Sequence, residues 1–275
     1  MKSSSGELKK RAKRNLKGNY GLCIGVEFII GGVIFAFYMF LFLGVIVLSL
    51  IGDHLSLEVP MGSEMLMIIL FSIFFTLLLV VVMGIFSPGI LKIYMNISSG
   101  NKAKLNDLFY GFKNKPLKFL GLYALVAVIS FLWVIPYLVV LVVCVITDFI
   151  PVMIVMLIAT YILMAVGTIL TSLYLSQSFF VMLDSPDKKI VSCIKESIEI
   201  MKGNKGRLFY ISLSFMGMIL LGYASFYIGF LWIFPYIRAT LVEFYQDLKP
   251  ELTSVSSGFE GQTYEEMQAN YSVTE

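Results

Sequence analysis

The sequence predicts an all-α membrane protein, a polytopic bundle of about six transmembrane helices arranged as three hairpins with cytoplasmic amphipathic segments. Composition is the first observation: 58% of the 275 residues are hydrophobic and 14% are charged, whereas soluble globular chains carry about 25% charged residues. The hydrophobic residues also gather in long blocks, and a run of about 20 apolar residues crosses a hydrocarbon core. Finally, the segments that contain Lys and Arg would all face the same side of a membrane.

Residues 1–20 are expected to form a basic amphipathic segment, because Leu8, Ala12 and Leu16 recur at helical intervals among lysines and arginines. The apolar run that follows is about twice as long as the core of a signal peptide, and it lacks a small-residue cleavage site. We therefore expect a retained first span rather than a cleaved leader.

The transmembrane domain is predicted to cover residues 21–248. Its apolar segments are 21–51, 65–95, 117–146, 150–182, 207–223 and 226–245. The first four exceed the minimum length of a span, so they must tilt, kink or extend beyond the bilayer. The last two are short and would meet in a tight turn, and one long or re-entrant segment is the alternative there. Residues 249–275 are acidic and lack apolar periodicity, which predicts a disordered cytoplasmic tail.

The distribution of basic residues predicts the orientation. All 21 Lys and Arg residues lie in 1–20, 92–118 and 188–207 or at Arg238 and Lys249, whereas the connections at 52–64 and 147–149 hold none. Basic residues gather on the cytoplasmic side of membrane proteins. The pattern predicts a multi-pass protein of the bacterial cytoplasmic membrane with an even number of spans and both termini in the cytoplasm.

A helical stripe after the fourth apolar segment is the candidate interface with lipid or with a partner protein. Apolar side chains recur there every three or four residues, with lysines beside and after them, a pattern that suits an anionic membrane surface. The candidate residues are Ile190, Ile194, Ile198, Met201, Lys202 and Lys205. The alternative is that the stripe packs on the cytoplasmic end of the bundle itself.

Polar residues within the apolar segments are the second group of candidates, because such residues often mark ion or proton paths. Glu27 lies near the start of the first segment and Arg238 in the last one. Thr168, Ser172 and Ser176 are spaced by four residues, so they share one face of a helix. We expect them to hydrogen-bond across helices, and the wall of a hydrated cavity is the sharper alternative. For Glu27, structural or interfacial use is favoured over a functional carboxylate.

No arrangement of residues predicts catalysis. His54 is the only histidine, so a multi-histidine metal site is excluded. The chain also lacks a glycine-rich phosphate loop, a dinucleotide fingerprint and G-x-S-x-G. We predict no catalytic, cofactor-binding or metal-binding residues and no nucleic-acid partner, and the sequence does not specify an oligomeric state.

Several strings along the chain carry a family resemblance. They are K-G-N-Y-G at 17–21, D-L-F-Y-G-F-K-N-K at 107–115, the stretch 183–209, and P-Y-I-R-A-T-L-V-E-F-Y at 235–245. W-x-x-P-Y also occurs twice, at 133–137 and 232–236, which suggests repeated hairpins. The chain resembles a bacterial membrane family, domain of unknown function 975, common in Gram-positive bacteria and distantly similar to the membrane domain of glycerophosphodiester phosphodiesterases. The resemblance implies a six-helix membrane protein and supplies no catalytic residues. Between Trp133 and Tyr174 the chain is longer and more apolar than the family pattern.

These observations predict a non-enzymatic integral membrane protein. The leading hypothesis is a scaffold or accessory subunit that presents a basic, amphipathic cytoplasmic face to membrane lipids or to a protein partner. The alternative is a permease-like component of a transporter for a small amphipathic molecule, peptide or lipid.

Overall fold

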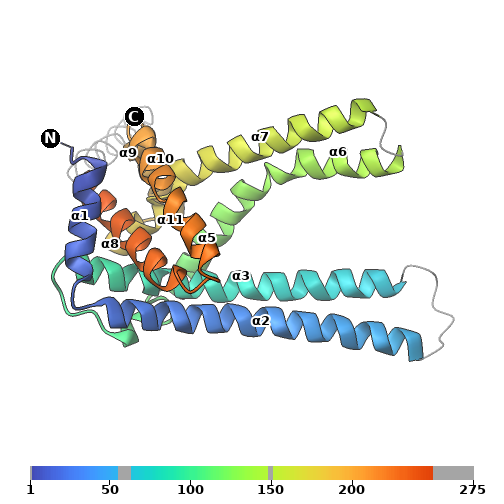
Figure 1. Cartoon of the computed structure of the whole chain (residues 1–275), viewed down its shortest axis with the longest axis horizontal. Helices are drawn as coiled ribbons and strands as arrows, with labels where there is room; N and C mark the ends of the chain where they lie inside the picture. Colours follow the sequence, from blue (N-terminus) through green and yellow to red (C-terminus); the bar gives the residue numbers. More distant parts are fainter. Residues whose placement is uncertain (1, 55–62, 148–150, 250–275) are drawn as a thin grey trace, which may run out of the picture.

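The computed structural model describes residues 2–54, 63–147 and 151–249, and every regular element within them is helical. The predicted all-α class is confirmed. Two long arms project from a common base (Figure 1). The first arm is α2 (Tyr20–His54) with α3 (Ser63–Ser98), and the second is α6 (Val134–Ile146) with α7 (Pro151–Leu175).

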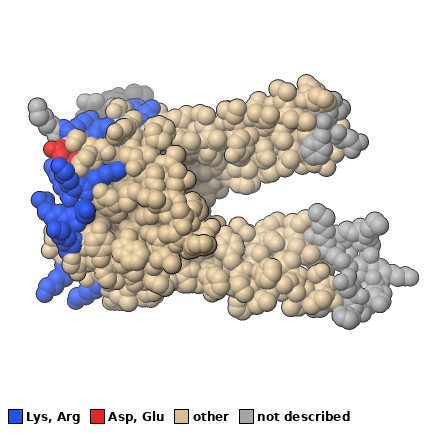
Figure 2. Space-filling view, in the orientation of Figure 1, with Lys and Arg blue, Asp and Glu red and all other residues tan. Residues whose placement is uncertain are grey.

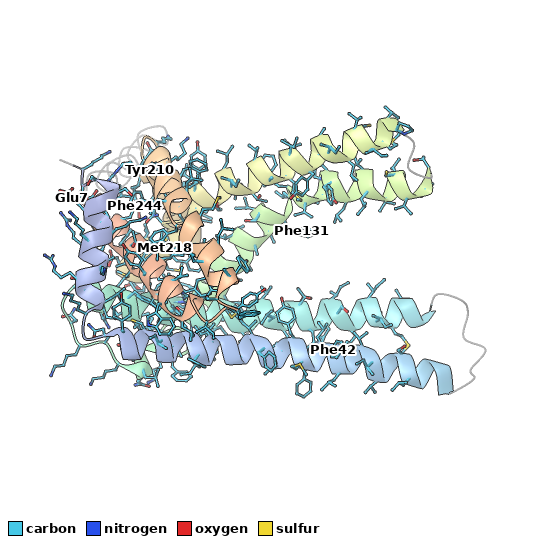
Figure 3. The ribbon with its side chains drawn as sticks, in the orientation of Figure 1. Glu7, Phe42, Phe131, Tyr210, Met218 and Phe244 are labelled. Carbon is cyan, nitrogen blue, oxygen red and sulfur yellow. The ribbon has the colours of Figure 1, made fainter. Side chains whose placement is uncertain are left out.

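The base is the end of the molecule at which the shorter helices pack on the long ones. Besides the last helix, residues 230–249, it holds α1 (Ser5–Leu16), η1 (Leu105–Phe109), α4 (Tyr110–Lys113), α8 (Ser178–Asp184) and α9 (Ile190–Met201). Buried side chains from these elements form one continuous apolar core, against which Tyr110 of α4 packs half-buried. Figure 3 shows the contrast: Phe244 lies inside the base, whereas Phe42 lies on the surface of an arm.

Several segments of the chain are long and apolar enough to cross a membrane. Four meet this criterion, Tyr20–Val47, Leu66–Ser98, Pro151–Asp184 and Lys205–Ala224. A fifth is added if Leu105–Lys113 and Pro116–Phe131, which meet at a bend of 88°, count as one span. The protein is therefore a multi-pass helical membrane protein, and the predicted count of six spans is not confirmed.

The predicted third span, 117–146, is interrupted in the structure. It divides into α5 (Pro116–Phe131) and α6, with the break at Leu132 and Trp133. Pro136 explains the break, because proline lacks an N–H and its ring clashes with the carbonyl group four residues earlier, here that of Leu132. Hydropathy alone does not register this interruption, since the residues from Phe131 to Ile135 are all apolar.

Trp133 fixes the second arm at that break. Its Nε1 donates a hydrogen bond of 2.8 Å to Thr171 Oγ1 on α7. Its ring lies so close to Gly167 that a Cβ atom there would come within 2.2 Å of it. The first W-x-x-P-Y string therefore docks α6 on α7, and the glycine permits the contact.

A third hairpin is shorter than the two arms. It consists of α10 (Lys205–Ser214), α11 (Met216–Ala224) and the last helix, and its tip reaches only partway along the arms (Figure 1). The tip is apolar: Phe226 is 88% exposed and Tyr227 and Ile228 are also exposed. Every backbone N–H from Ser225 to Ile233 nevertheless donates a hydrogen bond to an oxygen atom of the same hairpin. A turn with satisfied N–H groups and an apolar surface suits a lipid environment.

Candidate functional site

Charge gathers at the base of the molecule. Figure 2 shows Lys and Arg at one end, while the arms carry none over their visible described surface. No Asp, Glu, Lys or Arg occurs in 28–50, 66–91, 134–146 or 151–183. α1 lies across the base, with Leu8, Ala12 and Leu16 fully buried beneath it. Its opposite side exposes basic residues, which are Lys10, Arg11, Lys13, Arg14 and Lys17.

The last helix connects the elements of the base. Glu243 Oε1 accepts hydrogen bonds from Asn15 Nδ2 of α1 at 2.9 Å and from Ser98 Oγ of α3 at 2.5 Å. The hydroxyl group of Tyr245 donates to Asp184 Oδ2 of α8 at 2.7 Å, and Lys249 forms an ion pair with the same carboxylate oxygen at 3.1 Å. One helix thus holds three others in place.

Glu27 and Arg238, predicted separately as intramembrane polar residues, form an ion pair. Arg238 Nε lies 3.0 Å from Glu27 Oε1, and Nη2 donates to Oε2 at 3.3 Å. The hydroxyl group of Tyr94 donates to Glu27 Oε1 at 3.2 Å. The side chain of Glu27 is 6% exposed and that of Arg238 28%. These contacts give Glu27 a structural use, since its carboxylate links α2, α3 and the last helix.

A second cluster ties the start of the chain to its last helix. Arg207 Nη2 donates to Asp247 Oδ2 at 2.5 Å and to the carbonyl oxygen of Ser3 at 2.9 Å, and the Ser3 N–H donates to Asp247 Oδ1 at 3.2 Å. Burial alone would raise the pKa of Asp247, but the hydrogen bonds from Arg207 and Ser3 outweigh it and hold the pKa below its usual value. Asp247 therefore stays ionised at neutral pH. Sequence reasoning missed this cluster because its members are distant in the chain. Ser3 lies more than 200 residues before Arg207 and Asp247, and these two residues lie on different helices.

The candidate stripe on α9 faces the bundle rather than the surface. α9 packs against α5, α7 and α8. Ile194 and Met201 are buried, while Ile190 and Ile198 are half-buried against the apolar core. The prediction that these side chains form an interface with lipid or a partner is therefore wrong. They pack on the base, which was the alternative. The physical reason is that Ile194 and Met201 lie on the side of α9 turned toward the neighbouring helices.

The two lysines of this candidate set differ in their surroundings. Lys202 is exposed and pairs with Glu199 at 2.7 Å. Lys205 Nζ donates to the hydroxyl group of Tyr174 at 2.5 Å and lies 4.2 Å from the centre of its ring. Lys202 is therefore accessible at the surface, whereas Lys205 fastens the start of α10 to α7.

Ile194→Asp is expected to destabilise the protein by about 3 kcal/mol, because it forfeits the burial of an isoleucine and places a charge in an apolar contact. Ser192→Asp is the matched control, since it adds the same charge at an exposed position two residues away. The measurement is the rate of proteolysis or hydrogen exchange across α9 in detergent. Similar rates for the two variants would show that α9 does not pack on the base.

The hydroxyl stripe on α7 does not bridge helices as expected. Thr168 donates to the carbonyl oxygen of Met164, and Ser172 and Ser176 donate to those of Ile169 and Leu173 in the same helix. Hydroxyl groups in apolar helices commonly satisfy themselves in this way. Thr171, beside the stripe, does join two helices, because its hydroxyl group accepts from Trp133 as described above.

The contacts described above are packing contacts, ion pairs and hydrogen bonds. Across 2–54, 63–147 and 151–249, no three His, Cys, Asp or Glu side chains come together in a group able to hold a metal ion. Cys23, Cys144 and Cys193 are buried and unpaired with one another. The acidic residues Glu58 and Asp148 of the predicted outer connections lie outside the described residues, as does the acidic tail beyond Lys249.

Long apolar helices with Lys and Arg gathered at one end define the class, a multi-pass helical membrane protein. Within that class, the chain belongs to the family described as "Protein of unknown function (DUF975)", whose model matches residues 1–251. This match confirms the resemblance carried by the strings at 17–21, 107–115, 183–209 and 235–245. No curated protein and no solved structure matches the chain, and no match shows the similarity to glycerophosphodiester phosphodiesterases.

Proposed function

We propose that the protein is a non-enzymatic scaffold of the bacterial cytoplasmic membrane whose base, on the cytoplasmic side, presents a basic face to anionic lipid headgroups or to an acidic protein partner. The observation that carries this proposal is the one-sided charge of the base. Both termini then lie in the cytoplasm, as the distribution of Lys and Arg predicts.

Pairing within the base supports a net positive outer face. Glu27, Asp184 and Asp247 are occupied by basic partners inside the protein. Lys188 Nζ likewise lies 2.6 Å from Glu196, whose side chain is 5% exposed. The basic side chains on the outer side of α1 are exposed instead, so their charge acts on the surroundings. Such a face attracts anionic lipid by about 1 kcal/mol for each Lys or Arg near the surface.

The arms favour the scaffold over the permease-like alternative. Their described surfaces are apolar and hold no Asp, Glu, Lys or Arg over 28–50, 66–91, 134–146 and 151–176. A path for a polar or charged solute needs polar side chains that replace its hydration. The apolar surfaces of the arms instead suit contact with the acyl chains of lipids.

The proposal is tested with spin-labelled lipids in phosphatidylcholine vesicles that hold the purified protein. We expect more immobilised phosphatidylglycerol than phosphatidylcholine at the protein surface, with a preference that falls as salt is added. Replacing Lys10, Arg14 and Lys17 together by glutamine should remove most of the preference. Glu7→Gln, on the same helix, preserves the cap that Glu7 shares with Ser4 and should raise the preference. A wild-type protein without preference for the anionic lipid, and without an acidic partner, would contradict the scaffold.

Single cysteines at Ser56, Phe226 and Ser256, in a background without the native cysteines, are expected to give three different labelling results with an impermeant maleimide. A cysteine at Ser56 should react in intact cells, and one at Ser256 only after lysis. A cysteine at Phe226 should react in neither case, because the apolar tip of the third hairpin lies in the hydrocarbon core, where a thiolate does not form. Labelling of Phe226→Cys in intact cells would show instead that the hairpin crosses the membrane.

A further inference from the structure

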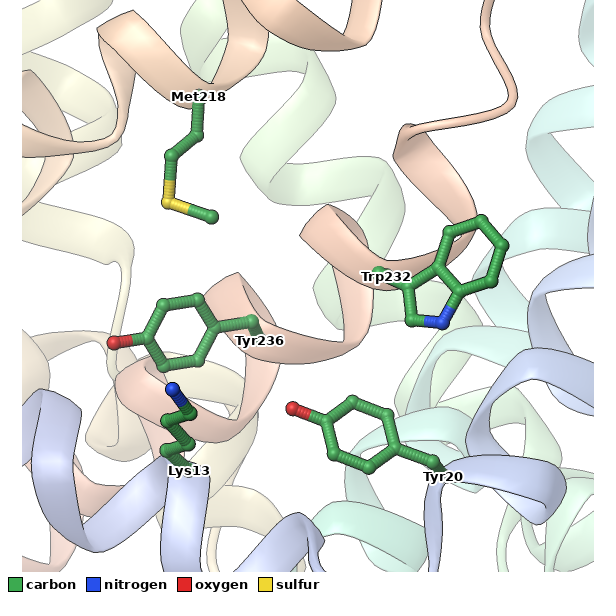
Figure 4. Close-up of a pocket in the computed structure, with 5 residues that line it drawn as sticks. All are labelled: Lys13, Tyr20, Met218, Trp232 and Tyr236. Carbon is green, nitrogen blue, oxygen red and sulfur yellow. The ribbon is translucent and has the colours of Figure 1, made fainter.

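A small pocket opens between α1, the start of α2, α11 and the last helix. It has a volume of about 200 Å³ and is lined by Lys13, Tyr20, Met218, Trp232 and Tyr236 (Figure 4). Figure 4 shows the hydroxyl group of Tyr20 and the ammonium group of Lys13 directed toward the space that the aromatic rings enclose. The two ends of the chain thus meet at this pocket, α1 from one side and the last helix from the other.

The polar atoms of the pocket are hydrogen-bond donors. They are the ammonium group of Lys13, the hydroxyl group of Tyr20 and the indole N–H of Trp232, whereas the hydroxyl group of Tyr236 points away from the other lining aromatic side chains (Figure 4). None of them hydrogen-bonds to another residue in the part of the chain that the structure describes, and no acidic side chain lines the pocket. A cation beside several free donors is complementary to an oxyanion such as a phosphate group.

The walls of the pocket are held by contacts that lie outside it. The ring of Phe215 packs edge-on against Tyr236, with ring centres 5.3 Å apart. Lys9 Nζ lies 4.0 Å from the centre of the Phe215 ring and donates to Ser214 Oγ at 2.6 Å. Because Lys9 belongs to α1, these contacts fix the position of α1 relative to α11. The pocket is therefore formed before any ligand binds.

Trp232 and Met218 give the pocket an apolar side. Trp232 is 52% exposed, although the tryptophan of the other W-x-x-P-Y string packs on Gly167. Tyrosine and tryptophan side chains with one apolar and one polar end collect at the level of lipid headgroups. The combination of a basic group, a hydroxyl group and an apolar wall suits the junction between a lipid phosphate and its glycerol backbone. The volume is smaller than that of pockets for drug-sized molecules, about 300–1,000 Å³, so it fits a headgroup rather than a whole lipid.

We infer that this pocket binds the phosphate of an anionic phospholipid headgroup, with Lys13 as its cation, Tyr20 and Trp232 as donors and the ring of Tyr236 as a wall. This inference rests on the proposed function, because it assumes that the base lies at the cytoplasmic surface of the membrane. It adds a defined site to the diffuse attraction of the outer face of α1. Free inorganic phosphate shares the same chemistry and is the other possible source of the anion.

Quenching of Trp232 fluorescence by brominated lipids tests the inference. The full-length protein is placed in vesicles of phosphatidylcholine with added phosphatidylglycerol, and either lipid carries bromine on its acyl chains. Brominated phosphatidylglycerol is expected to quench more strongly than brominated phosphatidylcholine at equal content. The difference should disappear in Trp232→Phe, which leaves Trp133 as the remaining tryptophan. Lys13→Gln should lower the preference about fivefold, whereas Lys195→Gln, at an exposed position of α9 that does not line the pocket, should change it less than twofold.

The outcomes separate the possible ligands from a failure of the inference. A preference that survives added inorganic phosphate identifies the lipid headgroup, and one that phosphate abolishes identifies an oxyanion site that takes phosphate from solution. Equal quenching by the two lipids in the wild-type protein overturns the inference, as does an equal effect of Lys13→Gln and Lys195→Gln. If spin-labelled phosphatidylglycerol is still preferred in that case, the scaffold stands and only the pocket is wrong. If that preference is also absent, the proposed function fails as well.

Discussion

Arg238→Ala is expected to lower the free energy of unfolding by about 3–5 kcal/mol, because it leaves the carboxylate of Glu27 buried without its cation. Glu27 is 6% exposed, and the remaining hydrogen bond from Tyr94 does not neutralise it. Membrane surroundings add to the penalty, since they supply less water to the uncovered charge. The measurement is unfolding of the detergent-solubilised protein by titration with sodium dodecyl sulfate.

Two further variants determine how the loss is interpreted. Lys202→Ala removes the cation of the exposed pair with Glu199 and should cost less than about 1 kcal/mol. Replacing Glu27 and Arg238 together by leucine should recover most of the stability, because the buried charge is removed along with its partner. If Arg238→Ala is no more harmful than Lys202→Ala, the ion pair does not hold the last helix.

The first arm was predictable from sequence because its signal is local. The segments 21–51 and 65–95 are predominantly apolar, and the structure places α2 and α3 over them. From Phe28 to Leu50 the exposed apolar side chains of α2 cover about 33 Å at about 1.5 Å per residue, which matches the thickness of a hydrocarbon core, about 30 Å. Length and hydropathy suffice for such an element.

Elements whose form depends on a distant partner were not predictable in the same way. The spacing of apolar residues identified α9, but its buried side also includes Glu196 and Ser197. Ser197 is buried because its hydroxyl group accepts from the backbone N–H of Gln177 and donates to the carbonyl oxygen of Tyr174. A pattern based on hydropathy assigns polar residues to the water-exposed side. The buried side of α9 therefore includes polar residues that a hydropathy pattern assigns to the exposed side.

The candidate polar residues show the same limit. Glu27 and Arg238 were identifiable individually, because charged residues are rare in apolar segments. Their pairing depends on how the last helix packs against α2. The local sequence of one helix does not predict where the other helix packs. Asp247 and Arg207 lie in less apolar stretches, where charged residues are ordinary, so no sequence signal distinguished them.

The contact between α3 and the η1–α4 segment gives the second large effect, and it depends on two glycines. A Cβ atom at Gly89 would lie 1.9 Å from the carbonyl oxygen of Leu108, and one at Gly111 would lie 2.1 Å from that of Ile85. Real Cβ atoms essentially never approach other atoms within 3.0 Å. Both obstacles are backbone atoms, so no side-chain rotation relieves them. The segment packs on α3 only because neither position has a side chain.

Gly89→Ala is therefore expected to destabilise the protein by about 3 kcal/mol, at the upper end of the usual cost of overpacking. The clash must separate η1 from α3, which also uncovers Leu108 and weakens the base. The matched control is Gly25→Ala in α2, where a Cβ atom would meet nothing within 4 Å. That change should stabilise the protein by about 0.5–1 kcal/mol, because alanine favours the helix more than glycine does. Unfolding in sodium dodecyl sulfate should thus move in opposite directions for two identical substitutions, and a shift in the same direction for both would contradict the close contact between the two backbones.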